Sequence, residues 1–133
     1  MSAPIIHASL PTTGWRDVTS LVTPELALGG KIRVLRTWDR VTWKLIGPFG
    51  AGVLLDVPGW LQPDHQPWDR PTVNIARHGS IRTTIMLNLG GVLAWADTLN
   101  LQGGDTDSAC SAELSYACLR PIPPTSDWIG IPA

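Results

Sequence analysis

Alternation of apolar and polar residues is the clearest pattern in the chain, and it is strictest from Cys110 to Cys118. The apolar positions of this segment are Cys110, Ala112, Leu114, Tyr116 and Cys118. Ser111, Glu113, Ser115 and Ala117 fall between them, so the other face is mostly polar. Because successive side chains of a strand point to opposite faces, this period of two predicts a strand with one buried face.

The segment 81–89 shows the same period and predicts another strand. Its apolar residues at 81, 85, 87 and 89 share one face, and the polar residues at 82, 84 and 88 face the other way. Gly90-Gly91 follows, and such a dipeptide tolerates the positive φ of a tight turn. The segment 92–96 is therefore predicted to return as the partner strand of a hairpin.

A second hairpin is predicted nearer the start of the chain, from the alternating segments 31–36 and 41–45. Trp38, Asp39 and Arg40 lie at its turn. Two shorter strands are expected at 53–57, which Pro58-Gly59 closes, and at 73–76, at the edge of a sheet.

Helical character is confined to 17–23, and Pro24 ends it. Several short strands separated by Gly and Pro predict an all-β fold, either an antiparallel β-sandwich or a barrel-like domain. The β core is expected over 15–119, with no proline between Pro71 and Pro121 to interrupt a sheet.

The two ends of the chain, 1–14 and 120–133, lack alternation and are rich in Pro, Thr and Ile. They are expected to form extended N- and C-terminal arms on the single domain. Ends without a core of their own fray unless they are docked. We therefore expect both arms to lie against a partner or a neighbouring copy of the chain.

Length and charge restrict the classes of function. The chain has 133 residues, which suits one domain, and a net charge of −1 argues against binding to duplex nucleic acid. Lys31, Arg33, Arg36 and Arg40 form a local basic stripe, which we interpret as a solvated strand face. No apolar run is long enough to insert into a membrane, and the N-terminus does not look like a secretory signal. Synthesis in the cytosol is expected.

The residue types that carry chemistry are sparse and scattered. As the two cysteines share a face of one predicted strand about 26 Å apart, they cannot form a disulfide and are expected to be buried. The histidines lack the spacing of a zinc site, and the calcium-like fragment 103–107 is explained by ordinary turns. No catalytic or nucleotide-binding motif is present. We expect no enzyme activity, no cofactor and no metal.

The Pro-rich loop 58–71 holds the best candidates for a contact surface. Trp60 and Trp68 lie outside any alternating segment, and a Trp on a rigid loop can present a stacking face to a sugar. The candidate surface-binding residues are Trp60, Trp68, His65, Asp64 and Asp69. The alternative is that the two tryptophans fold back over the end of the barrel. Core packing also accounts for seven Trp beside one Phe and one Tyr.

Several motifs, in order, resemble a known family. Gly14-Trp-Arg-Asp-Val-Thr-Ser-Leu-Val22 resembles the opening of the distal β domains of tail fibres and minor tail proteins from actinobacterial phages. Leu55-Asp-Val-Pro-Gly-Trp-Leu-Gln-Pro63 is similar to a Leu-Pro-x-Gly-aromatic-x-Pro element of that family. Gly91-Val-Leu93 and the tail Pro121–Pro132 follow in the same order.

The resemblance covers roughly residues 14–130, through short and degenerate motifs. It departs from the family in two ways: Trp38-Asp39 replaces the usual Gly-Asn-type turn, and the domain is expected to stand alone, without the long fibre stem that usually precedes it.

The resemblance implies a virion structural protein, assembled in the host cytoplasm and placed on the outside of the particle. Its partners would be copies of itself in a homotrimer, other virion proteins and host cell-wall glycan. A carbohydrate-binding module or lectin, and a capsid decoration protein (head fibre), stay open as alternatives.

Overall fold

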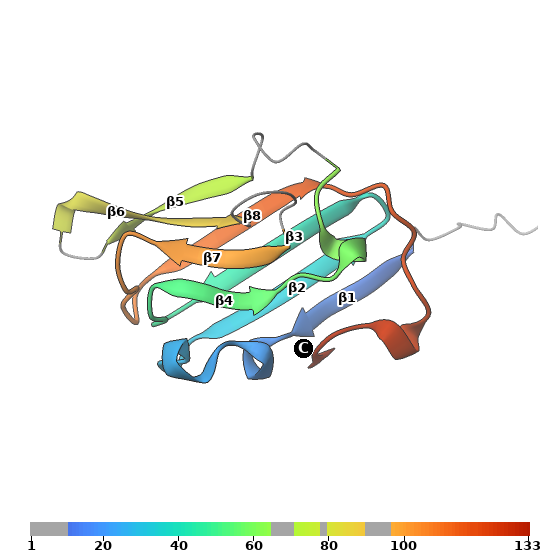
Figure 1. The fold of residues 1–133 in the computed structure, drawn as a ribbon, viewed down its shortest axis with the longest axis horizontal. Coiled ribbons are helices and arrows are strands. Elements are labelled where there is room, and N and C mark those ends of the chain that lie inside the picture. Colours follow the sequence, from blue (N-terminus) through green and yellow to red (C-terminus); the bar gives the residue numbers. More distant parts are fainter. Residues whose placement is uncertain (1–10, 65–70, 78–79, 90–96) are drawn as a thin grey trace, which may run out of the picture.

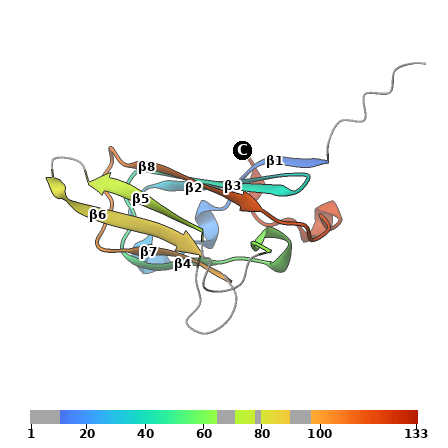
Figure 2. The same ribbon diagram turned by 90° about the horizontal axis from the view of Figure 1, so that it is seen from above.

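The computed structural model describes residues 11–64, 71–77, 80–89 and 97–133 as two antiparallel β-sheets that face each other (Figures 1 and 2). In order, the first sheet holds β8 (Ser111–Ala117), β3 (Arg40–Ile46), β2 (Lys31–Thr37), β1 (Thr12–Asp17) and β9 (Ile131–Pro132). The second holds β4 (Gly52–Asp56), β7 (Thr98–Gln102), β6 (Ser80–Leu89) and β5 (Thr72–Arg77). The only helices in the described part are single 3₁₀ turns, η1 (Thr19–Leu21), η2 (Pro24–Leu26), η3 (Gly59–Leu61) and η4 (Thr125–Asp127). The prediction of an all-β fold is confirmed, as a sandwich and not a closed barrel.

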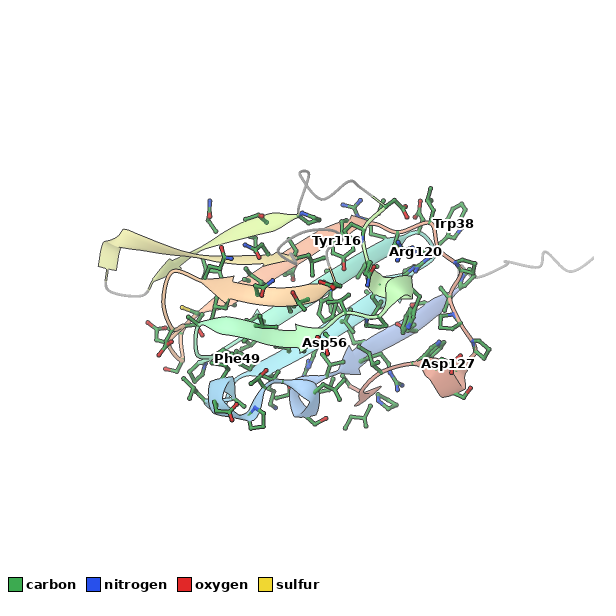
Figure 3. The ribbon with its side chains drawn as sticks, viewed as in Figure 1. Trp38, Phe49, Asp56, Tyr116, Arg120 and Asp127 are labelled. Carbon is green, nitrogen blue, oxygen red and sulfur yellow. The ribbon has the colours of Figure 1, made fainter. Side chains whose placement is uncertain are left out.

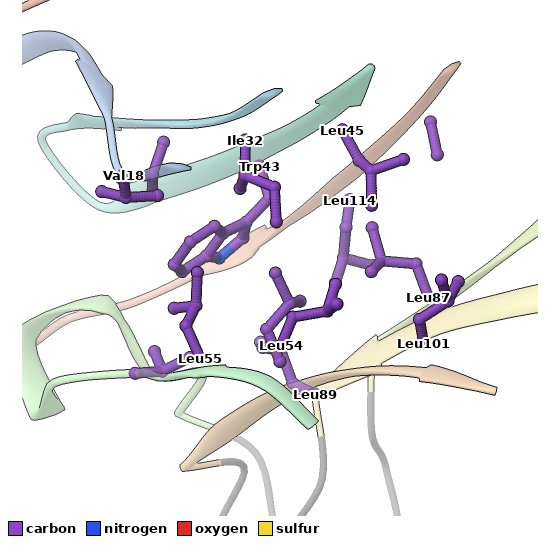
Figure 4. Packing of buried hydrophobic residues seen from close by; sticks show 14 of the residues in the cluster. Val18, Ile32, Trp43, Leu45, Leu54, Leu55, Leu87, Leu89, Leu101 and Leu114 are labelled. Carbon is purple, nitrogen blue, oxygen red and sulfur yellow. The ribbon is translucent and has the colours of Figure 1, made fainter. Parts of the chain in front are cut away.

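The alternating segments form the strands that the sequence predicts. β2 and β3 make the expected hairpin, with Val34 opposite Trp43, and β8 pairs with the other edge of β3, with Leu114 opposite Trp43. The inner faces of both sheets meet in one apolar cluster around Trp43 (Figure 4). Cys110 and Cys118 flank β8 as buried free thiols, so the prediction that they do not pair is confirmed.

The interpretation of Arg36 as part of a solvated basic stripe is wrong. Arg36 follows Ile32 and Val34 on the inner face of β2, and its side chain is 3% exposed. Lys31 and Arg33 lie on the outer face instead, because the period of the strand separates odd from even positions.

The predicted strand at 92–96 lies outside the described residues. In the described part, β6 pairs with β5 on one edge and with β7, which begins at Thr98, on the other. Leu87 and Leu89 of β6 face the core, as the alternation predicts. The helical character expected at 17–23 reduces to η1, and Pro24 begins the separate turn η2.

The two connections that cross between the sheets run side by side. Thr106, which follows β7, accepts a hydrogen bond from the amide of Phe49 through Oγ1 at 2.7 Å. The same hydroxyl donates to the carbonyl of Gly47 at 2.8 Å, and the Thr106 amide donates to the carbonyl of Phe49 at 2.9 Å. These bonds join the β3–β4 connection to the β7–β8 connection where both leave their sheets.

The C-terminal segment lies against the chain's own β1, which corrects the expectation that this arm needs a partner to be ordered (Figure 1). Arg16 of β1 donates hydrogen bonds to the carbonyls of Ile129 and Gly130, and its guanidinium lies 5.6 Å from the centroid of the Trp128 ring. Pairing of β9 with β1 continues this contact, and the amide of Ala133 donates to the carbonyl of Trp15. At the other end, β1 begins at Thr12, within the predicted N-terminal arm, and residues 1–10 lie outside the described part.

Gly130 is the residue on which this docking depends most directly. It has a φ of 74°, and an added Cβ would meet the main-chain oxygen of Asp17 and lie 2.8 Å from a methyl group of Val18. Gly130→Ala is therefore expected to detach the C-terminal segment, with faster amide hydrogen exchange at Ala133. Gly14→Ala is the matched control, since Gly14 has a similar φ of 62° and open space around it. Equal exchange at Ala133 in the two variants would contradict the prediction.

Candidate functional site

Three segments that are distant in the sequence meet at one end of the sandwich (Figure 3). They are the β2–β3 turn at Trp38 and Asp39, the loop 57–64 that contains η3, and the segment 118–122 after β8. Main-chain bonds such as Cys118 N to the carbonyl of Asp39 join some of them, and side-chain hydrogen bonds from a few polar residues supply the remaining links.

The guanidinium of Arg36 is the centre of this arrangement. It donates hydrogen bonds to the main-chain carbonyls of Trp38, Trp60, Cys118 and Arg120, and to the Cys118 thiol at 3.3 Å. One side chain therefore contacts all three segments. A guanidinium has five N–H donors in a fixed plane, and this geometry suits several carbonyls at once.

Arg120 and Asp64 hold the loop 57–64 from its outer side. Arg120 Nη1 donates to the carbonyl of Gly59 at 2.8 Å and to Gln62 Oε1 at 2.9 Å. Asp64 Oδ2 accepts the amide of Leu119 at 2.6 Å. These bonds fix the loop relative to the segment after β8.

The buried Tyr116 hydroxyl supports the same loop from inside the core. It accepts a hydrogen bond from Trp43 Nε1 at 2.7 Å and donates to the carbonyl of Leu61. Burial is the largest cause that raises the pKa of this phenol far above its ordinary value of about 10. The neutral form of Tyr116 is therefore strongly favoured in the folded protein.

The raised pKa of Tyr116 predicts a loss of stability in alkali. Its contribution is fully present below about pH 10, because both the folded and the unfolded states then hold the proton. Above that pH only the unfolded state ionises, so we expect the free energy of unfolding to fall by up to about 1.4 kcal/mol per pH unit. Urea unfolding at about pH 9 and about pH 11 measures this fall. Tyr116→Phe keeps both lysines and removes the only tyrosine; an equal fall in this variant would refute the assignment.

A pocket of about 280 Å³ opens beside the Arg36 guanidinium. We call it the Trp38 pocket; its lining residues are Pro11, Arg36, Trp38, Asp39, Cys118, Leu119, Arg120, Pro121 and Ile122. Trp38 is 58% exposed and Leu119 is 73% exposed, so its apolar wall is open to water. A second pocket, of about 370 Å³, has Asp56 as the one charged residue among its described lining residues. The Trp38 pocket therefore offers the richer chemistry for binding.

The backbone of Trp38 is unusual. Its φ of 49° makes it the one non-glycine residue with a positive φ in the described part of the chain. Three hydrogen bonds hold the turn in place: Trp38 N to the carbonyl of Pro11, Arg36 Nε to the carbonyl of Trp38, and Cys118 N to the carbonyl of Asp39. A bulky residue in this region is strained, and such strain persists where surrounding contacts impose it.

The predicted surface residues are placed differently from Trp38. Trp60 is half-buried and packs against the core, which agrees with the alternative that it covers the end of the sandwich. Asp64 is exposed, but its carboxylate is engaged by the Leu119 amide. His65, Trp68 and Asp69 lie outside the described residues. A role for these five residues in binding stays a prediction.

The described residues 11–64, 71–77, 80–89 and 97–133 contain no group of three or more His, Cys, Asp or Glu side chains placed to hold a metal ion. Within the same residues, no helix has the length and apolar character to cross a membrane. Around the calcium-like fragment, Asp107 accepts the amide of Ala109, as expected for a turn, whereas Asp105 accepts the amide of Ala51 from the β3–β4 connection. Comparison with protein-family models, curated proteins and solved structures finds no significant match.

Proposed function

We propose that this chain is a non-catalytic binding protein of a phage virion, a tail-fibre or minor tail component that contacts the host surface through the Trp38 pocket. The order of motifs from Gly14 onward supports the virion assignment. The main observation that supports contact with the host surface is Trp38. It is a largely exposed aromatic residue, held in a strained conformation beside a pocket.

The strain at Trp38 points to a role in binding and not in folding. Glycine or asparagine is the residue type that this backbone conformation favours, and Trp gains little from burial when 58% of it is exposed. A rigid aromatic ring gives large contact area for a small loss of conformational entropy when it binds. The fold therefore bears a local cost at Trp38, and this cost supports a role for the exposed ring in contact with another molecule.

Trp38→Gly is expected to separate stability from binding. Relief of the strained φ should raise the free energy of unfolding by about 1 kcal/mol, while loss of the ring should abolish adsorption of the purified protein to host cells. Adsorption is measured with fluorescently labelled protein, and stability by urea unfolding. Trp15→Ala is the matched control, because Trp15 lies on β1 away from the pocket. Adsorption by Trp38→Gly at the level of the unaltered protein would exclude the pocket.

The virion assignment is tested separately. Electron microscopy of purified particles with gold-labelled antibody against the chain should place label on the tail, and its absence from particles would overturn the assignment. Light scattering over a concentration series should give a stable trimer, since the resemblance implies a homotrimer and soluble homo-oligomers usually have closed symmetry.

A free-standing carbohydrate-binding module is the second candidate. The exposed Trp38 ring next to the carboxylate of Asp39 favours it, because sugar sites combine an aromatic face with polar groups that bind hydroxyls. A persistent monomer in light scattering, together with glycan binding and no label on particles, would favour this candidate over the tail component.

A further inference from the structure

The Trp38 pocket has an excess of positive charge at its base. Arg36 is 3% exposed, and its hydrogen-bond partners are four neutral main-chain carbonyls and a thiol. Within the described residues, no carboxylate forms an ion pair with this guanidinium. Carbonyl dipoles satisfy its donors without cancelling its charge, so the charge acts on whatever enters the pocket beside it.

Arg120 adds a second guanidinium with unused donors. Its Nη1 group is occupied by Gly59 and Gln62, whereas Nε and Nη2 have no partner in the described part of the chain. The Nε and Nη2 hydrogens of an arginine point the same way in one plane, and this edge binds both oxygens of a carboxylate. Among the described residues that line the pocket, Asp39 is the one acid, so the two arginines leave a net positive charge.

The remaining walls suit a ring and not an extended chain. Trp38 and Leu119 provide an exposed apolar face, and Asp39 provides an oxygen that accepts a hydrogen bond from a hydroxyl. At about 280 Å³ the pocket is near the lower end of the range for small-ligand sites. A peptide with several acidic side chains would bring like charge against Asp39, whereas a sugar brings hydroxyls.

We propose that the Trp38 pocket binds one sugar ring that carries a carboxylate, an acidic residue of a host-surface glycan. Arg120 binds the carboxylate through Nε and Nη2, Trp38 packs against the apolar face of the ring, and Asp39 accepts a ring hydroxyl. The charge of Arg36 strengthens the attraction without a direct bond. This proposal deepens the host-surface role and rests on it.

The test compares two probes that differ only in the carboxylate, methyl β-D-glucuronide and methyl β-D-glucoside. Titration is followed by the NMR signals of the tryptophan indoles. We expect the glucuronide to bind at least about tenfold more tightly at low salt, with the preference shrinking as salt rises. Arg120→Gln should reduce the preference to about twofold or less. Arg40→Gln is the control of equal charge change, because Arg40 lies on the outer face of the same hairpin and should keep the preference in full.

Asp39→Asn should change the affinity for the glucuronide in the opposite direction. It removes the negative charge that repels the sugar carboxylate, and the main-chain carbonyl of residue 39 still accepts the amide of Cys118. We expect this variant to bind the glucuronide more tightly. Equal affinity for the two probes, no binding of either, an unchanged preference in Arg120→Gln, or equally tight binding of an acidic tripeptide would each overturn the proposal. If one of these results is found and adsorption to host cells still depends on Trp38, only the proposed ligand class is wrong. If adsorption does not depend on Trp38, the host-surface role also falls.

Discussion

Arg36→Met should lower the free energy of unfolding by about 4 kcal/mol, which corresponds to a fall in Tm of about 15 °C for a domain of this size. Methionine fills a similar length but donates no hydrogen bond. Four carbonyls that Arg36 now satisfies, from three segments, would lose their donor. Each unsatisfied buried carbonyl costs about 1–3 kcal/mol, and water entering from the adjacent pocket offsets part of that cost.

Two further variants make this prediction specific. Arg40→Met removes an exposed arginine from the same hairpin and should change stability by no more than about 0.5 kcal/mol. Arg36→Lys keeps the charge with three donors and should fall between the two. If Arg36→Met proves as stable as Arg40→Met, water replaces the guanidinium fully and Arg36 does not hold this end of the sandwich together.

Trp43→Ala is expected to be at least as damaging, at about 4–5 kcal/mol. Trp43 is the largest fully buried side chain among the described residues, and it lies between the two sheets, near Leu54 and Leu55 (Figure 4). Its removal leaves a cavity and deprives the Tyr116 hydroxyl of a donor. Urea unfolding followed by circular dichroism measures the loss without relying on tryptophan fluorescence.

The contribution of the Trp43–Tyr116 hydrogen bond to stability can be separated from that of packing by milder substitutions. Trp43→Phe and Tyr116→Phe each retain an aromatic ring, and the double variant completes a cycle. We expect a coupling free energy of about 1 kcal/mol between the two positions. A coupling near zero would show that Trp43 acts through packing alone.

The sequence predicts the strands that have one face against the opposite sheet. In β2, β3 and β8 buried positions alternate with more exposed ones, because each strand contributes its inner face to the core, and this environment imposes a period of two. β1 and β9 leave no such signal, since β1 is only partly buried on either side and β9 has two residues. Their pairing depends on Arg16 and Gly130, which no periodicity reveals.

The candidate site is less predictable because its partners come from distant parts of the chain. The period of β2 does place position 36 on the inner face, but arginine is rarely buried, so composition suggests a solvated side chain. Its partners at Trp60, Cys118 and Arg120 are found only once the chain is folded. The sequence feature that could have indicated the pocket is Trp38 itself, because it is a bulky residue at a turn where glycine or asparagine is usual.

The side-by-side crossing of the two connections between the sheets has a consequence for the order of folding. β3 receives its second partner, β8, only after residues 47–110 have been synthesised, and β4 likewise waits for β7. Such distant pairings slow folding, because the loop must close before the contacts stabilise it. During synthesis the growing chain therefore exposes the unpaired edge of β3, a surface on which strands of neighbouring chains can pair. We expect overexpressed chains to aggregate mainly at this stage, and chains truncated before residue 111 to remain insoluble at any temperature.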